Sequence, residues 1–273
     1  MRFLKINANP GRAASVLLAV APFALVIAVY LVTAHQRHKE NPQDKLVPTL
    51  SEMGRGFYST AFEPDRKDEY RLLVDTLASG RRFLISVALM SIAVLIGLHM
   101  GLLPYVEKLL LRFVVFFDKI PALAVLPILF IVFGLGETSK VMLIVIGTAL
   151  VMIRAVAQGV SELPEEMIVK AQTLGASTWQ LIIRVIVPQI LPKLFMAIRL
   201  GLVPAWIFLV SAEAIASTEG LGYRIFLVRR YLAMDVILPY VAWITLIAYI
   251  LDRILMLVSR WLFPWSDNRG GAV

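Results

Sequence analysis

Residues 161–192 read SELPEEMIVKAQTLGASTWQLIIRVIVPQILP and separate two long apolar stretches. The segment carries too many polar residues to cross a lipid bilayer. Pro164, which two glutamates follow, is typical of the first turn of a helix. Gly175 predicts the end of that helix, and Ser177 suits the N-cap of a second one. We therefore predict two short helices meeting at a bend on the membrane surface, where they form either a docking surface or a connector without a partner.

The rest of the chain is dominated by apolar stretches. Hydrophobic residues make up 59% of the 273 residues and charged residues 17%, whereas a soluble protein has about 45–50% and about 25%. The apolar residues fall in blocks of about 20, the length that crosses a bilayer. The chain is thus predicted to be an all-α integral membrane protein with about six spans, near residues 14–33, 83–103, 113–133, 139–159, 189–212 and 238–258.

These blocks divide the chain into four regions. Residues 1–34 form an N-terminal transmembrane helix whose basic leader predicts a cytoplasmic N-terminus. Residues 35–80 form a polar extracytoplasmic loop, and helical spacing of apolar residues near its end predicts a surface helix on the membrane. Residues 81–265 hold the other five spans, and residues 266–273 form a cytoplasmic tail.

The sequence excludes several kinds of chemistry or lacks the motifs for them. The chain has no cysteine, and its three histidines lie in two separate regions, at positions 35 and 38 and at position 99. No metal site is therefore predicted. No P-loop is present, so any ATP that drives this protein must be held by another chain. The net charge of +8 comes from basic residues that flank the spans, which is typical of membrane proteins and does not indicate nucleic-acid binding.

Prolines and ionisable residues in or near the spans are candidate pathway positions. Pro121 and Pro127 interrupt the third block, where they indicate either a pathway lining or a packing kink. Ionisable groups in a membrane are costly and are therefore functional candidates. Asp118 and Lys119 are either pathway residues or an interfacial pair, and the side chain of Arg199 either lines the pathway or extends to the headgroups. The pathway and gate candidates are Asp118, Lys119, Pro121, Arg199 and Glu213.

The 161–192 segment resembles the signature loop of ABC importer permeases. That loop reads Glu-Ala-Ala, three residues, Gly, nine residues and Ile-x-Leu-Pro. Here Val169, Lys170 and Ala171 stand at the first three positions, Gly175 at the glycine, and 185–188, ending in Pro188, at the last four. The spacing is intact, while the glutamate and the first alanine of the motif are absent.

Further motifs resemble the nitrate, sulfonate and taurine branch of these permeases over residues 75–265. They comprise IPALAVLP at 120–127, FGLGETSK at 133–140, Gly-Leu at 201–202, Ser-Ala-Glu at 211–213 with Gly-Leu-Gly at 220–222, and Phe-Pro-Trp at 263–265. The chain departs from the branch at Arg154, where apolar residues and an asparagine are usual, and at Asp118 and Lys119 before the Ile-Pro pair.

The resemblance implies a type I importer-permease fold with a cytoplasmic coupling helix in the bacterial inner membrane. It implies a solute pathway without catalytic residues, a homodimer, separate ATPase subunits that hold ATP and Mg²⁺, and a binding protein that delivers a small, anionic solute. The coupling segment would be 161–188, with contacts from Lys170, Ala171, Gly175, Ala176, Ser177, Trp179 and Pro188. Arg224, Arg229 and Arg230 are the candidate contacts to acidic residues of the binding protein, with Glu213 at the outer gate.

Other functional classes fit the sequence less well. A channel or secondary transporter working alone is the main alternative, and many such transporters have internal repeats. No repeat is found in this chain. A membrane enzyme would need facing acids, histidines or serines. An anchor protein would not need the bent pair of helices predicted in residues 161–192.

Overall fold

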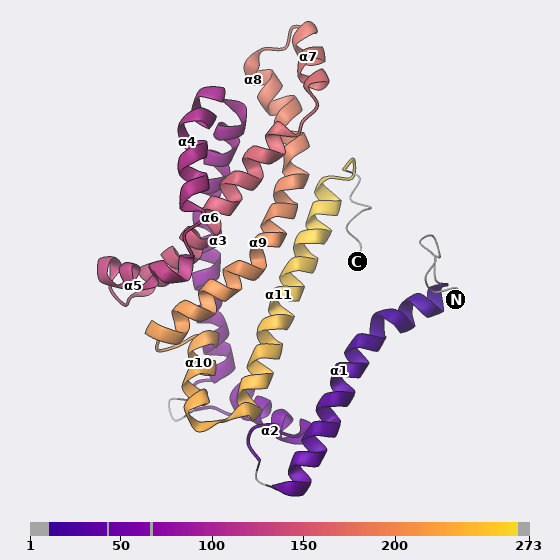
Figure 1. Cartoon of the computed structure of the whole chain (residues 1–273), viewed down its shortest axis with the longest axis vertical. Helices are drawn as coiled ribbons and strands as arrows, with labels where there is room; N and C mark the ends of the chain where they lie inside the picture. Colours follow the sequence, from indigo (N-terminus) through magenta and orange to yellow (C-terminus); the bar gives the residue numbers. More distant parts are fainter. Residues whose placement is uncertain (1–10, 43, 66–67, 267–273) are drawn as a thin grey trace.

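The computed structural model describes residues 11–42, 44–65 and 68–266, and all the regular secondary structure in these ranges is helical (Figure 1). The basic leader at Arg2 and Lys5 and nearly all of the 266–273 tail lie outside the described residues. The elements are α1 (Arg12–Glu40), α2 (Leu50–Ala61), α3 (Arg71–Leu102), α4 (Pro104–Phe117), α5 (Ala122–Phe133), α6 (Glu137–Ser161), α7 (Glu165–Thr173), α8 (Thr178–Leu181), the π-helical η2 (Ile182–Ile186), α9 (Val187–Ala216), α10 (Leu221–Val228), the 3₁₀ turn η3 (Arg229–Tyr231) and α11 (Met234–Leu262).

Five stretches are long and apolar enough to span a bilayer: α1, α3, α6, α8 to α9, and α11. A sixth exists if α4 and α5, which meet at a bend of 95°, count as one broken span. The predicted all-α membrane fold is confirmed. The third predicted span is interrupted near Pro121, since the chain turns between Phe117 and Ala122. Pro121 disfavours helical geometry at the preceding residue, so α5 begins only after it.

The predicted surface helix at the end of the polar loop is also wrong as a separate element. Its residues form the first turns of α3, which continues through Gly80 into the span. The helix of the polar region is instead α2, whose N-terminus is closed by a capping box between Thr49 and Glu52. The hydrogen bonds from the backbone N–H and hydroxyl of Thr49 lower the pKa of Glu52.

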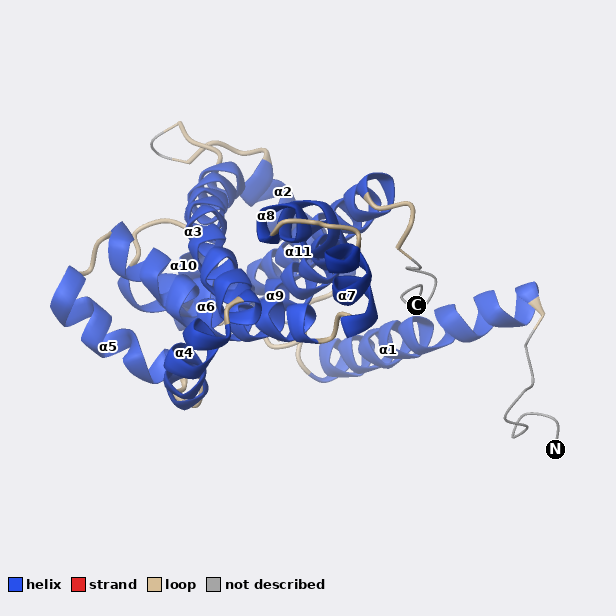
Figure 2. Ribbon diagram, turned by 90° about the horizontal axis from the view of Figure 1, so that it is seen from above, coloured by secondary structure: helices blue, strands red, loops and turns tan. Residues whose placement is uncertain are grey.

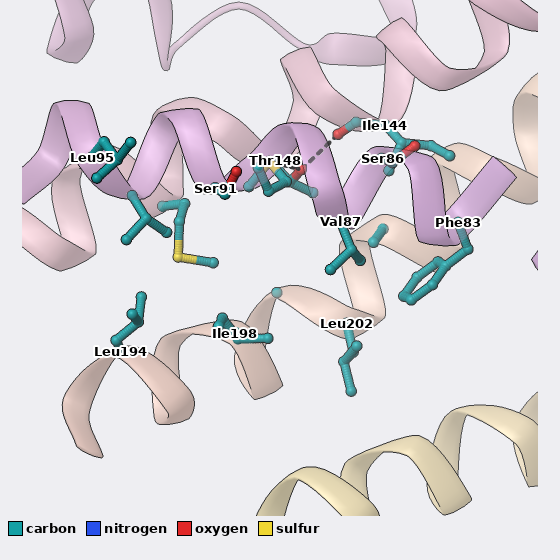
Figure 3. A pocket seen from close by; sticks show the side chains of 15 residues that line it. Phe83, Ser86, Val87, Ser91, Leu95, Ile144, Thr148, Leu194, Ile198 and Leu202 are labelled. Carbon is teal, nitrogen blue, oxygen red and sulfur yellow. Dashed lines mark hydrogen bonds between the residues drawn. The ribbon is translucent and has the colours of Figure 1, made fainter. Parts of the chain in front are cut away.

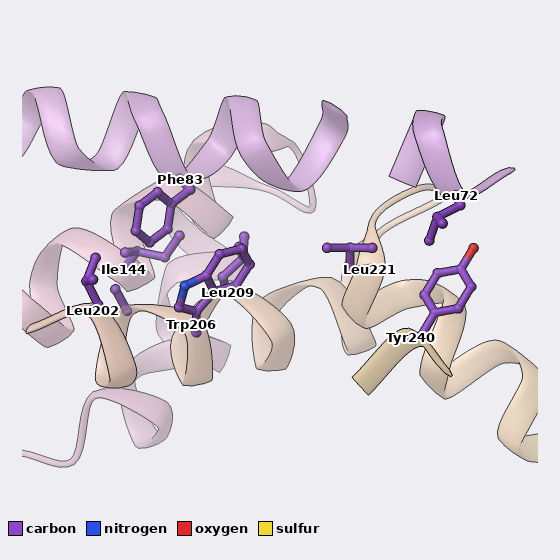
Figure 4. Packing of buried hydrophobic residues seen from close by; sticks show 9 residues of the cluster. Leu72, Phe83, Ile144, Leu202, Trp206, Leu209, Leu221 and Tyr240 are labelled. Carbon is purple, nitrogen blue, oxygen red and sulfur yellow. The ribbon is translucent and has the colours of Figure 1, made fainter. Parts of the chain in front are cut away.

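Helices α3, α6 and α9 pack together, whereas α1 stands apart from the bundle (Figures 1 and 2). In the core, the ring of Phe83 on α3 stacks on Trp206 of α9 with centroids 5.1 Å apart (Figure 4). Ile144 of α6 and Leu209 complete this layer. The most apolar part of α1 has no buried residue, so lipid or another chain must cover that surface.

Gly97 allows α3 and α6 to approach closely. A β-carbon at Gly97 would lie 2.6 Å from the carbonyl oxygen of Ile153 on α6. Replacing Gly97 with alanine should therefore destabilise the protein by about 1–3 kcal/mol, the usual cost of overpacking. Thermal unfolding in detergent measures this loss. Gly80→Ala in the same helix is the control, because its β-carbon would meet nothing within 4 Å; equal melting temperatures for the two variants would contradict the prediction.

Candidate functional site

The elbow between α7 and α8 projects from one end of the molecule (Figure 1). Gly175 follows the C-cap of helix α7, and its φ of 81° lies in the left-handed region that favours glycine. The amide of Gly175 donates to the carbonyl of Gln172 at 2.9 Å, and that of Ala176 to Ala171 at 3.0 Å. This pair of bonds is a Schellman motif. Ser177 then caps α8 through a capping box with Gln180, so both predicted helices and their bend are confirmed.

The elbow exposes apolar side chains. Leu174 is 88% exposed and Trp179 69%, and Lys170 and Ser177 are exposed beside them. Ala171 and Ala176 are half-buried, as is Pro188 in the first turn of α9. The π-helical segment η2 follows directly, a geometry that is common at functional sites. The elbow is thus a fixed, partly apolar projection suited to a groove on another protein.

An ion pair joins the base of the elbow to α9. The ammonium of Lys193 lies 2.9 Å from the carboxylate of Glu162, which also accepts from the Gln158 amide at 3.0 Å. The Lys193 hydrogen bond, with a smaller effect from Gln158, lowers the pKa of Glu162.

At the opposite end of the molecule, Glu213 is fully buried in a polar network. Its carboxylate accepts from Arg82 at 2.7 Å, from the Ser79 hydroxyl at 2.8 Å and from the amide of Gly222 at 2.8 Å. Arg82 also donates to Glu137 at 2.6 and 2.9 Å. One carboxylate therefore ties α3, α9 and α10 together, with α6 attached through Arg82.

A second buried carboxylate, Asp75, fixes the turn before α10. It accepts from Arg224 at 2.8 Å, the amide of Gly220 at 2.9 Å and the hydroxyl of Tyr240 at 3.1 Å. The side chain of Arg224 is only 18% exposed. In this conformation Arg224 is an internal ion-pair partner rather than a free surface cation, and Glu213 is a buried structural acid.

The residues of α3 in this network were missed by the sequence reasoning. Asp75, Ser79, Arg82 and Ser86 recur at spacings of three and four, so they share one helical face. All four are buried. This polar stripe is the sequence signal that could have predicted the buried network, because polar side chains on one face of an otherwise apolar span must find partners inside the protein.

The other predicted site residues lie apart from one another. Asp118, at the break between α4 and α5, forms an ion pair with Arg154 of α6. Arg199 of α9 binds Asp252 of α11 with two hydrogen bonds, at 2.7 and 3.0 Å. The structure thus places Asp118, Arg199 and Glu213 in three separate pairs. Outside the elbow, four further predicted residues are exposed: Lys119, Pro121, Arg229 and Arg230.

A cavity of about 390 Å³ lies between α3, α6 and α9 (Figure 3). The surface of its walls is almost wholly apolar. The hydroxyls of Ser86 and Thr148 on its wall donate to backbone carbonyls of their own helices, at 2.8 and 2.6 Å. This cavity offers little for polar recognition. In the described ranges, no group of three or more acidic, histidine or cysteine side chains is placed to hold a metal.

Comparison with known proteins identifies the family. The model of the "Binding-protein-dependent transport system inner membrane component" family matches residues 90–269. The chain belongs to this family. It is therefore a multi-pass transport component rather than an enzyme, and the resemblance to ABC importer permeases is confirmed. The match begins within α3, so α1 and α2 lie outside it.

Individual permeases agree with this membership. The taurine transport permease TauC of Escherichia coli (strain K12) is 38% identical over 173 residues, and the match spans 63% of each protein. A probable ABC transporter permease of Brucella abortus (strain 2308) is 33% identical over 199 residues, 72% of this chain and 80% of that one. The MetNI methionine ABC transporter in inward-facing conformations gives a TM-score of 0.58 at 19% identity, covering 69% of this permease and 94% of that chain; this supports the fold alone.

Proposed function

We propose that this permease forms half of the solute pathway of an ATP-driven importer, and that its elbow couples the pathway to a separate ATPase subunit. The observation that carries the proposal is the elbow itself, a Schellman-closed bend at Gly175 that exposes Leu174 and Trp179. Large exposed apolar side chains on a rigid projection are typical of a docking surface. The ATPase partner would hold ATP and Mg²⁺, and this chain would hold neither.

The proposed substrate is a small organosulfonate such as taurine. The taurine permease of Escherichia coli is 38% identical to this chain, and an aliphatic sulfonate permease of the same organism is 28% identical over 160 residues. A binding protein would deliver the solute at the end opposite the elbow. Arg229 and Arg230 are exposed there, and they suit contacts with acidic residues of such a protein.

The proposed assembly is a homodimer in the bacterial inner membrane. One chain supplies one elbow, and a dimer of ATPase subunits would need two. With the elbow in the cytoplasm, α1 would begin on the cytoplasmic side, since its C-terminal end lies with α2 at the opposite end of the molecule (Figure 1). The basic residues before α1 suit that orientation.

Gly175→Asp should abolish copurification of the ATPase. The substitution puts a β-carbon into a left-handed conformation and a charge on the docking bend. We expect a P-loop ATPase to copurify with the tagged wild-type protein from its native membrane and at least a tenfold loss with the variant. Quantitative mass spectrometry of the pull-down in mild detergent measures the ratio.

Gly136→Asp is the matched control, because Gly136 lies before α6, away from the elbow, and a β-carbon there meets nothing within 4 Å. It should retain the ATPase. Failure of the wild-type protein to bring down any ATPase in several mild detergents would contradict the proposal and favour a transporter that works alone.

A further inference from the structure

A second cavity, of about 240 Å³, lies between α3, α4 and α6 at the elbow end of the molecule. Its polar wall comes from Glu107 of α4 and from Arg154, Gln158 and Ser161 of α6. The three α6 residues recur at spacings of four and three and so share one face. At 1.5 Å per residue they extend along about 10 Å of the helix.

Arg154 supplies hydrogen-bond donors to this cavity. Its Nη1 atom donates to Asp118, and no other hydrogen bond of its guanidinium is present in the described part of the chain. The side chain is 42% exposed, whereas Asp118 is 11% exposed. Arg199 differs, because both its Nε and Nη2 atoms bind Asp252. Arg154 therefore keeps donors of the fork geometry that suits an oxyanion.

The end of the cavity nearer the elbow supplies acceptors instead. The Gln158 amide nitrogen donates to Glu162 at 3.0 Å, which leaves its amide oxygen available. The Ser161 hydroxyl donates to the Gln158 carbonyl at 2.9 Å, which leaves its lone pairs available. Glu107 is exposed, and among the residues described its carboxylate has no hydrogen bond or ion pair. An ammonium has three donors and no acceptor, so these three oxygens suit it.

We propose that this cavity binds a short zwitterion, a 2-aminoethyl oxyanion, with its oxyanion on Arg154 and its ammonium on Glu107, Gln158 and Ser161. The lining carries one guanidinium and one carboxylate, so its charges match a zwitterion, while a plain anion would meet the Glu107 carboxylate and a plain amine the Arg154 guanidinium. Asp118 is a positioning residue that holds Arg154 at the cavity.

Two molecules carry this chemistry. One is a free 2-aminoethyl sulfonate leaving the pathway, and this source rests on the function proposed above. The other is the ethanolamine phosphate headgroup of a lipid in the same leaflet as the elbow, and this source does not. In taurine two carbons separate the ammonium nitrogen from the sulfur, and in the headgroup two carbons and an ester oxygen separate it from the phosphorus.

The test uses the full-length chain in nanodiscs of phosphatidylglycerol alone, with tritiated taurine as the probe in a scintillation proximity assay. Arg154→Gln and Glu107→Gln should each weaken binding at least tenfold, because each removes a charge-assisted hydrogen bond. Arg112→Gln and Glu40→Gln are the controls, since both side chains are exposed and outside the cavity. Ala157→Leu fills the cavity without changing its charge, so it tests the site even where a charge variant fails to fold.

A second arm measures, by native mass spectrometry, the phosphatidylethanolamine that each variant retains from mixed nanodiscs. If the wild-type protein binds taurine and the cavity variants do not, the solute is the source. If the wild-type protein binds no taurine and the cavity variants retain less lipid than the controls, the headgroup is the source. Equal taurine binding and equal lipid retention in cavity variants and controls would overturn the inference. ATP-dependent taurine uptake by wild-type vesicles with the binding protein tests the proposed function separately.

Discussion

Replacing Arg82 with methionine should lower the free energy of unfolding by about 3–5 kcal/mol, the usual cost of removing one partner of a buried ion pair. Arg82 is 2% exposed and Glu213 is not exposed at all. Without the guanidinium, the Glu213 carboxylate stays buried and keeps only the Ser79 and Gly222 donors. Thermal unfolding in detergent, followed by tryptophan fluorescence, should show a melting temperature lower by roughly 6–15 °C.

Arg81→Met is the matched control, because Arg81 is the exposed neighbour of Arg82 on the same helix. The double variant Arg82→Met, Glu213→Gln should recover part of the loss, since it also removes the unpaired charge. If Arg82→Met and Arg81→Met melt at the same temperature, the network does not hold the ends of α3, α9 and α10 together.

Trp179→Ala should reduce copurification of the ATPase at least tenfold without destabilising the permease. Exposed tryptophans at an interface are frequent hot spots, where truncation costs about 2 kcal/mol or more. Trp179 is 69% exposed, so its loss removes little packing within the chain. Leu174→Ala, at the tip of the same bend, should also reduce copurification of the ATPase, by a smaller factor.

Trp261→Ala controls for the loss of an exposed tryptophan, because Trp261 is 81% exposed in the last turn of α11. It should leave the ATPase bound. Equal retention by Trp179→Ala and Trp261→Ala, at equal melting temperatures, would show that the aromatic side chain of the elbow is not the anchor.

The parts of the structure that follow from local patterns were predictable. Apolar blocks of about 20 residues are enough to predict spans, and the Gly175 break with the Ser177 cap is enough to predict the elbow. The prediction of a separate surface helix was wrong because no local signal in the sequence ends that helix before the span. No proline interrupts the chain between Arg71 and Leu102, so the amphipathic first turns and the span form one continuous helix.

The pairing of charges was beyond the reach of the sequence. Glu213 and Arg224 were singled out as single residues, but their partners are 131 and 149 positions away, at Arg82 and Asp75. Which arginine meets which acid depends on how α3, α9 and α10 cross, and crossing is decided by packing over the whole bundle.

The sequence by itself determined that this protein is a helical membrane protein with an importer-type elbow, because span length, helix caps and motif spacing are properties of neighbouring residues. Only the tertiary structure decided that the third span breaks by 95°, that Arg154 meets Asp118 beside a polar cavity, and that Arg82 and Glu213 lie buried together. Those features depend on contacts between distant segments. In a low-dielectric interior such contacts decide whether a charge is a partner inside the fold or a group available to a ligand.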